Sequence, residues 1–282
     1  MRRLQLFEIH EQAWFPQFLR DYVTEALQIL LELGNLYGPA VRRLQKTLEV
    51  TKADRVVDLC SGAGGPWLSL TDQLAGRSPL EICLTDKYPH EKASIGARRL
   101  HSRRIHFHPV PVEATQIPAG LKGFRTMFTA FHHFPPQKAR AILEDAVLSR
   151  QGIGIFEASG KHVFTIFLIL LLPFLYFVVV PFVRPFRWER LLWSYLIPVL
   201  PLVLLFDGIV SCLRAYSPKE LREFTEGISG ADYTWEIGEM TGGRMPARVT
   251  FLIGYPSPEF ARRVENLSSE IASHQAVANA GG

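Results

Sequence analysis

The sequence predicts an α/β protein built on a doubly wound, mostly parallel seven-stranded sheet, with N-terminal helices and an inserted hydrophobic helical hairpin. Three observations predict this fold. Short β-branched runs alternate with helix-like segments over residues 51–162, two further strand-like runs follow position 211, and a long uncharged stretch lies between these parts. Strands that alternate with helices form parallel sheets covered by helices on both faces.

Seven short apolar runs have the length and composition of strands. They cover residues 55–59, 81–85, 105–112, 124–130, 152–157, 233–239 and 248–255. Helical spacing between them predicts helices over 66–74, 91–100, 136–148 and 217–226. Pro66 suits the start of its helix, where a missing N–H does no harm. Ser217 is a good N-cap for the last of these helices.

The remaining segments complete the expected organisation of the chain. Apolar residues at helical spacing over 15–31 and 36–48 predict helices in the first fifty residues. We therefore divide the chain into four parts: an N-terminal helical cap (1–50), a sheet core (51–162 and 211–258), a hydrophobic hairpin (163–210) and a C-terminal tail (259–282).

Composition narrows the classes of function. Hydrophobic residues make up 48% of 282 positions, and most of the excess lies between 163 and 210. The net charge of +4 comes without a long basic run, so we expect no nucleic-acid partner. The three cysteines form no CxxC pair, and no histidine has zinc-finger spacing, so we expect neither a metal nor a disulfide framework.

A glycine-rich turn follows the first predicted strand. Asp58 and Ser61 precede Gly62, Gly64 and Gly65, a spacing that differs from the dinucleotide fingerprint G-x-G-x-x-G. A carboxylate in this turn repels a pyrophosphate but suits a cationic amino acid or a sulfonium. Asp86 ends the second strand, where a carboxylate can accept hydrogen bonds from both ribose hydroxyls.

These residues resemble the motifs of class I S-adenosylmethionine-dependent methyltransferases over roughly residues 50–160 and 213–256. The resemblance rests on Val56–Gly65, Leu84–Asp86 and Phe131–Phe134. It implies a Rossmann-like fold with S-adenosylmethionine as cofactor, and it leaves open a nucleotide-binding fold of another kind. The implied cofactor contacts are Asp58, Ser61, Gly62, Gly64, Asp86, Lys87, Glu113, Ala114 and Phe131. Glu113 departs from the family's pattern, which often has Asp at the adenine position.

His132, His133 and Glu157 are the candidate catalytic residues. They follow the fourth strand or end the fifth, at the carboxyl edge of the sheet where doubly wound folds hold their sites. Either histidine can serve as a general base near neutral pH, and the alternative is that it packs in the core or on the cofactor. Glu157 is expected to contact the substrate or cap a helix. Tyr88 and Trp67 either wall the pocket or pack beside it.

The hairpin has two uncharged runs of unequal length. Residues 163–183 are long enough to cross a bilayer core, whereas 191–206 are not. Full crossing would place the link with Arg184, Arg187 and Arg190 on the far side, against the positive-inside tendency. We therefore expect a monotopic or re-entrant hairpin with its arginines near lipid phosphates. A two-helix span and a buried dimer interface are the alternatives.

The hairpin follows the fifth strand, beside the predicted active edge, so it would place the mouth of the site on the bilayer. We expect a membrane-associated methyltransferase with its catalytic domain on the cytoplasmic side, acting on a lipid or another hydrophobic acceptor. Two alternatives remain open: a membrane-anchored methyltransferase with a soluble or protein substrate, and a non-catalytic scaffold with the same fold. The accepting atom and the oligomeric state stay open as well.

Overall fold

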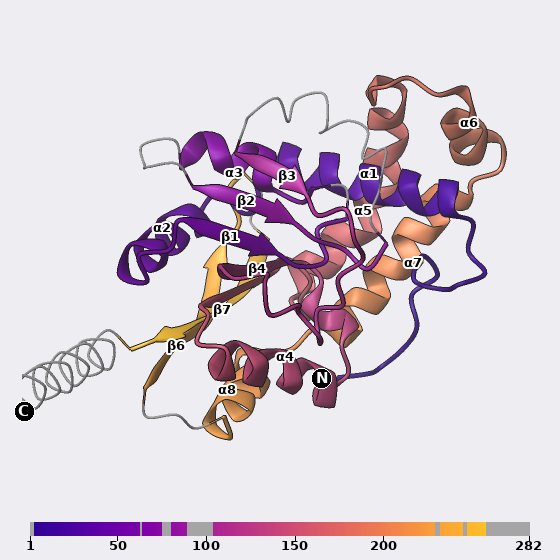
Figure 1. Ribbon diagram of the computed structural model, residues 1–282. Coiled ribbons are helices and arrows are strands. Elements are labelled where there is room, and N and C mark those ends of the chain that lie inside the picture. Colours follow the sequence, from indigo (N-terminus) through magenta and orange to yellow (C-terminus); the bar gives the residue numbers. More distant parts are fainter. Residues whose placement is uncertain are drawn as a thin grey trace, which may run out of the picture.

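The computed structural model describes residues 3–62, 64–74, 80–88, 104–228, 232–244 and 247–257. A central sheet carries helices on both faces, and a group of helices stands at the ends toward which β2 and β3 point (Figure 1). The predicted helix over 91–100 and the C-terminal tail (259–282) lie outside the described residues.

All seven predicted strands are present and form one sheet in the order β3-β2-β1-β4-β5-β7-β6. The strands are β1 (Arg55–Asp58), β2 (Glu81–Leu84), β3 (Ile105–Phe107), β4 (Phe124–Phe128), β5 (Ile153–Glu157), β6 (Tyr233–Thr241) and β7 (Arg248–Pro256). The third strand is shorter than predicted, because it ends at Phe107 rather than at position 112.

The sheet is mixed, which corrects the expectation of a mostly parallel one. The pairs β1·β2, β1·β4, β2·β3 and β4·β5 are parallel, whereas β7 is antiparallel to both β5 and β6. The connection from β6 to β7 spans residues 242–247. So short a link can join antiparallel strands but cannot make the crossover that a parallel pair needs. The last two strands are therefore a hairpin added to the sheet beside β5.

The two faces of the sheet separate cleanly along β1. Val56 belongs to the core under α2 (Ala40–Val50) and α3 (Trp67–Gln73), and Val57 to the core under α4 (Pro136–Leu148) and α8 (Pro218–Glu226). Successive side chains of a strand point to opposite faces, so one β-branched pair supplies both cores. The strand order reverses direction beside β1, which places a crevice at the carboxyl ends of β1 and β4.

The expected start of α8 is confirmed. The Ser217 hydroxyl accepts from the backbone N–H of Glu220, and the Glu220 carboxylate accepts from the backbone N–H of Ser217. This capping box satisfies two N–H groups that the helix cannot pair internally.

The hydrophobic insertion forms helices that pack on α1 (Gln17–Gly34). It contains α5 (Val163–Val179), a 3₁₀ turn (Val180–Phe182), α6 (Trp188–Leu191), a π-helical segment (Leu192–Leu196) and α7 (Val199–Arg214). A third core cluster joins the three long helices, including Val23 of α1, Tyr176 of α5 and Leu204 of α7. α7 runs past the expected end of the insertion at residue 210, and Asp207 lies buried within it.

A buried ion pair fastens α6 to α1. Arg190 Nη2 lies 2.5 Å from Glu25 Oε2, and their side chains are 2% and 6% exposed. Arg190 also donates to the carbonyl of Val183. This corrects the expectation that all the link arginines lie near lipid phosphates, since Arg190 faces inward, while Arg184 is exposed.

Removing one partner of this pair leaves a buried charge without compensation. Glu25→Gln should therefore lower the free energy of unfolding by about 3–5 kcal/mol, measured by urea denaturation in detergent. Glu144→Gln is the matched control, because it breaks an ion pair with Arg140 in which both side chains are 42% exposed. We expect a change below about 0.5 kcal/mol there. Equal effects of the two substitutions would contradict the structural role of the buried pair.

Candidate active site

The glycine turn after β1 uses backbone conformations that favour glycine. Gly62, Gly64 and Gly65 have φ of 54°, 115° and 54°. Space is also short at Gly62, where an added Cβ would lie 2.9 Å from Thr24 Cγ2 of α1. The turn is thus pressed against α1, and a side chain at position 62 would separate the two.

Asp58 holds this turn from behind. The Thr126 hydroxyl donates to Asp58 Oδ1 at 2.6 Å, and the hydroxyls of Ser61 and Thr85 donate to the Asp58 carbonyl. The side chain is buried, and burial raises its pKa to about 6. The structure therefore shows Asp58 tying β1 to β4.

Asp86 joins the turn to the end of β2. The backbone N–H of Gly62 donates to Asp86 Oδ2 at 2.8 Å, and that of Tyr88 donates to Oδ1 at 2.9 Å. Each carboxylate oxygen has a second lone pair, so the residue can hold the turn and still accept from ribose hydroxyls.

The neighbouring Lys87 is paired with Glu113. Lys87 Nζ lies 2.5 Å from Glu113 Oε1, and both side chains are about half exposed. The hydrogen bond that Lys87 donates to the Glu113 carboxylate raises the pKa of Lys87. The carboxylate of Glu113 is thus paired with the ammonium group of Lys87, which lines the same cavity.

Glu157 organises the turn after β4. Its Oε1 accepts from the backbone N–H groups of Ala130 and Phe131 at 2.9 and 2.6 Å. Its Oε2 accepts from His132 Nδ1 at 2.6 Å. Glu157 is buried, so it acts here through His132, as a positioning residue.

The pKa values of the two histidines of this turn are shifted in opposite directions. Burial opposes protonation of His132, but the carboxylates of Glu157 and Glu8 outweigh it and raise its pKa to about 10. Burial and the neighbouring His132 lower the pKa of His133. They are therefore not two equivalent bases.

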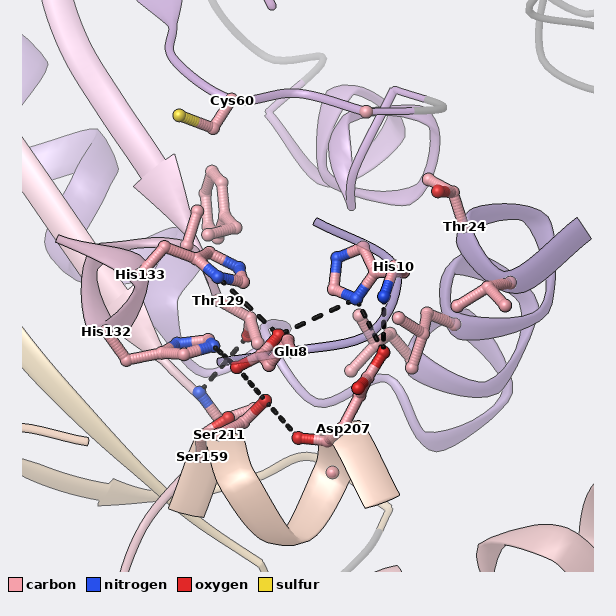
Figure 2. Close-up of a pocket in the computed structure, with 18 of the residues that line it drawn as sticks. Glu8, His10, Thr24, Cys60, Thr129, His132, His133, Ser159, Asp207 and Ser211 are labelled. Carbon is pink, nitrogen blue, oxygen red and sulfur yellow. Dashed lines mark hydrogen bonds and ion pairs between the residues drawn. The ribbon is translucent and has the colours of Figure 1, made fainter. Parts of the chain in front are cut away.

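Figure 2 shows the residues around these histidines. The Glu8 carboxylate points between His132, His133 and His10, above the helix that carries Asp207 and Ser211. Asp207 Oδ1 accepts from the backbone N–H of Ile9 at 2.7 Å, and Oδ2 lies 2.8 Å from His10 Nδ1. The N-terminal segment is thereby held on α7, across the mouth of the sheet edge.

One cavity of about 770 Å³ connects these groups. Its polar end includes Ser61, Gly62, Asp86, Lys87, Tyr88, Glu113, Ala114, His132 and His133. Its apolar end lies between α1, α5 and α7 and includes Leu27, Leu31, Leu168, Ile169, Leu172, Leu175 and Leu204. Six of the nine predicted cofactor-binding residues and both predicted catalytic histidines thus line this cavity.

Four other predicted site residues, and Trp67, do not line the cavity but lie in the protein interior next to it. Asp58 and Glu157 brace turns, and Gly64 is buried beside Leu84 and Phe107. Phe131 is fully buried and packs on Tyr216, because the 3₁₀ turn rotates it into the core while His132 faces the cavity. Trp67 is buried against Phe128, so of the two alternatives it packs in the core rather than walling the pocket.

Sequence reasoning missed the N-terminal part of the site and a possible ligand set. Glu8, His132 and His133 place potential metal-binding atoms within 4.8 Å of one another, contrary to the expectation that no such set exists. Glu8 is far from both histidines in the sequence, so spacing gave no signal. The sequence did carry a signal for Asp207, because placing an acidic side chain within an apolar run costs free energy and therefore indicates a function.

No protein-family model and no curated protein matches the chain. Solved structures that are similar to it include a putative O-methyltransferase from Nostoc punctiforme (12% identity, TM-score 0.47) and an O-methyltransferase family protein from Burkholderia thailandensis (16%, 0.42). Human N-acetylserotonin methyltransferase in complex with S-adenosylmethionine is another (15%, 0.46). The alignments cover 83%, 83% and 91% of this chain and 59%, 59% and 63% of those chains. The chain therefore spans about three fifths of their length.

The raised pKa of Asp58 predicts a pH dependence of stability. The folded pKa of about 6 lies above the ordinary value of 3.8, so the folded state holds an extra proton between these values. The free energy of unfolding therefore falls as pH rises through this window, by roughly 3 kcal/mol from this group.

Asp58→Asn should remove that part of the slope, measured by urea unfolding at pH 4.5, 5.5 and 7. The control is Asp54→Asn, at an exposed position directly before β1. Identical slopes for wild type and Asp58→Asn would contradict the account.

Proposed function

We propose that the protein is an S-adenosylmethionine-dependent methyltransferase that acts at a membrane surface on a hydrophobic, lipid-like acceptor. The observation that carries this proposal is the single cavity that runs from the glycine turn and Asp86 to the apolar walls of α1, α5 and α7. Methyl transfer is an in-line displacement, so both reactants must lie side by side in one enclosed site.

The polar end supports the cofactor. The glycine turn presents backbone at close range, and the adjacent Asp86 carboxylate offers acceptors for two hydroxyls. Ala114 and the Lys87–Glu113 pair line the place where the family resemblance puts the adenine. An intact set of these groups favours a working enzyme over a catalytically silent scaffold.

The apolar end supports a hydrophobic acceptor. Its leucines come from helices of both the N-terminal cap and the insertion, and they line the same cavity as His132 and His133. A soluble polar substrate would leave its polar groups unpaired against these walls, at a cost of free energy. The volume lies in the upper part of the range of about 300–1,000 Å³ that small-molecule sites occupy.

The outer surface of the insertion supports contact with a bilayer. Phe167, Phe174 and Val178 of α5 are 53%, 68% and 66% exposed, and grouped exposed apolar side chains mark interaction or membrane surfaces. Residues Val163–Phe182 are long and apolar enough to cross a membrane, with a mean hydropathy of 2.9. The returning segment is bent by 71° between Leu196 and Val199, and this bend favours a monotopic hairpin over two straight spans.

Cofactor binding tests the first half of the proposal. Asp86→Asn should weaken S-adenosylmethionine binding roughly 10- to 100-fold, since hydrogen bonds to a charged group contribute about 1.5–3 kcal/mol. The measurement is calorimetry on the full chain in detergent, with Asp54→Asn as the control. Absence of binding by folded wild type would sink the proposal, and unchanged binding by Asp86→Asn would remove Asp86 from the site.

Vesicle flotation tests the second half. The double substitution Phe167→Ser and Phe174→Ser should abolish co-flotation with phosphatidylcholine–phosphatidylglycerol vesicles, because it removes the apolar contact, while cofactor affinity is retained. The control is Leu148→Ser, at a residue that is 83% exposed at the end of α4. Flotation undiminished in the double variant would argue against α5 as the membrane face.

A further inference from the structure

The buried cluster of Figure 2 brings three potential metal ligands to one point. Glu8 Oε1 lies 3.4 Å from His132 Nε2, and Glu8 Oε2 lies 3.5 Å from His133 Nδ1. Ligands that stand about 2.0–2.1 Å from a tetrahedral ion are about 3.3–3.5 Å from one another. Each separation has the length expected between two ligands of one ion and exceeds the length of a good hydrogen bond, although the two are measured from different oxygens of Glu8. One potential ligand atom from each of the three residues lies within 4.8 Å of the other two.

His132 supplies an independent observation that points to a ligand. It is 1% exposed, and its Nε2 is buried without a hydrogen-bond partner in the described structure. Its other ring nitrogen is held by Glu157 at 2.6 Å. A carboxylate that fixes one nitrogen of a histidine and leaves the other aimed at a common point is the arrangement found behind metal-ligating histidines.

His133 and Glu8 are held in compatible positions. His133 Nδ1 is also buried without a hydrogen-bond partner, although Glu11 Oε1 lies 2.6 Å from it in ion-pair contact. Glu8 is 1% exposed, and its Oε1 accepts from the Ser211 hydroxyl at 3.0 Å and lies 3.3 Å from Arg214 Nη1. These contacts fix the carboxylate through Oε1, while Oε2 lies 3.7 Å from His10 Nδ1 and 3.5 Å from His133 Nδ1.

The charge of the cluster also favours a cation. Four carboxylates gather around three imidazoles, those of His10, His132 and His133, and the guanidinium of Arg214 contacts two of the acids. The carboxylates belong to Glu8, Glu11, Glu157 and Asp207. Four negative charges and one positive charge leave three negative charges for protons or a metal to offset. A bound divalent ion is the largest local charge in such a site.

We propose that Glu8, His132 and His133 bind one divalent transition-metal ion of the zinc class, with a coordination position open to the cavity. Two imidazoles and one carboxylate suit zinc and its neighbours, and three protein ligands leave a fourth place for water or substrate. All three residues line the cavity. The ion takes the place of a proton between His132 and Glu8, because a ligating imidazole must be neutral.

The use of this ion rests on the proposed methyltransferase function. The open position would take the hydroxyl oxygen of the acceptor, and the metal would lower the pKa of that hydroxyl. The released proton would leave to solvent through the cavity, since both histidines would then be ligands. The oxygen forms its bond to the methyl carbon as the carbon–sulfur bond breaks, and that electron pair stays on sulfur, which becomes a neutral thioether.

The test is titration of the metal-stripped full chain in detergent with Co²⁺, followed by visible absorption, and with Zn²⁺ by calorimetry. We expect one ion per chain and a d–d spectrum typical of four-coordinate Co²⁺. Glu8→Gln and His132→Gln should weaken binding by at least about 100-fold, and Glu157→Gln by about 10- to 100-fold with the spectrum retained. His106→Gln is the control, at a side chain that is 43% exposed beside Glu81.

Folding is checked in each variant by circular dichroism and by the shift in Tm that Zn²⁺ causes. A Tm that rises with Zn²⁺ in wild type and His106→Gln but not in folded Glu8→Gln supports the site. No stoichiometric binding by wild type, or equal affinity in wild type and folded Glu8→Gln, would overturn it. Calorimetry with S-adenosylmethionine is run separately on metal-stripped protein, so loss of the proposed function and loss of the metal site give different results.

Discussion

The carboxylate of Glu157 is the constraint on which the site depends. It accepts two backbone N–H groups from the turn after β4 and a third hydrogen bond from His132. A buried carboxylate is tolerated only when it is paired and hydrogen-bonded, and this one has all its partners in a single turn. The turn is thereby rotated so that Phe131 enters the core and His132 faces the cavity. The contacts of Glu8 with His132 and His133 depend on that orientation.

The cavity is completed by parts of the chain that lie far from the sheet in sequence. Asp207 of α7 binds the backbone of Ile9 and the ring of His10, which brings Glu8 against the histidines. The buried pair of Arg190 and Glu25 holds α1 to the insertion on the other side. The cavity at the carboxyl edge of the sheet is thus lined by polar groups on one part and by leucines of α1, α5 and α7 on another. This combination distinguishes the site from a simple nucleotide pocket.

Local sequence patterns predicted the strands of the sheet and several residues of the polar end of the cavity, because both depend on short-range chemistry. β-branched runs, the glycine turn and Asp86 are each readable within a dozen residues. The expectation of a mostly parallel sheet was wrong, because β7 is antiparallel to both of its neighbours, although the short link before β7 carried the signal for a hairpin. The placement of Glu8 and the inward face of Arg190 could not be read, because each depends on a partner more than a hundred residues away. Periodicity also cannot tell which residue of a 3₁₀ turn faces the core, which is why Phe131 was misplaced on the cavity wall.

The central claim is that cofactor and hydrophobic acceptor share one cavity, and transfer of label tests it most directly. The full chain is incubated with S-adenosylmethionine labelled at the methyl group and a membrane lipid extract, and label is counted in the organic phase. Leu168→Trp fills the apolar end, whereas Leu170→Trp changes a residue of the same helix that is 48% exposed. The account predicts organic-phase label from wild type and Leu170→Trp but not from Leu168→Trp. Label confined to water-soluble products, or undiminished transfer by Leu168→Trp, would contradict it.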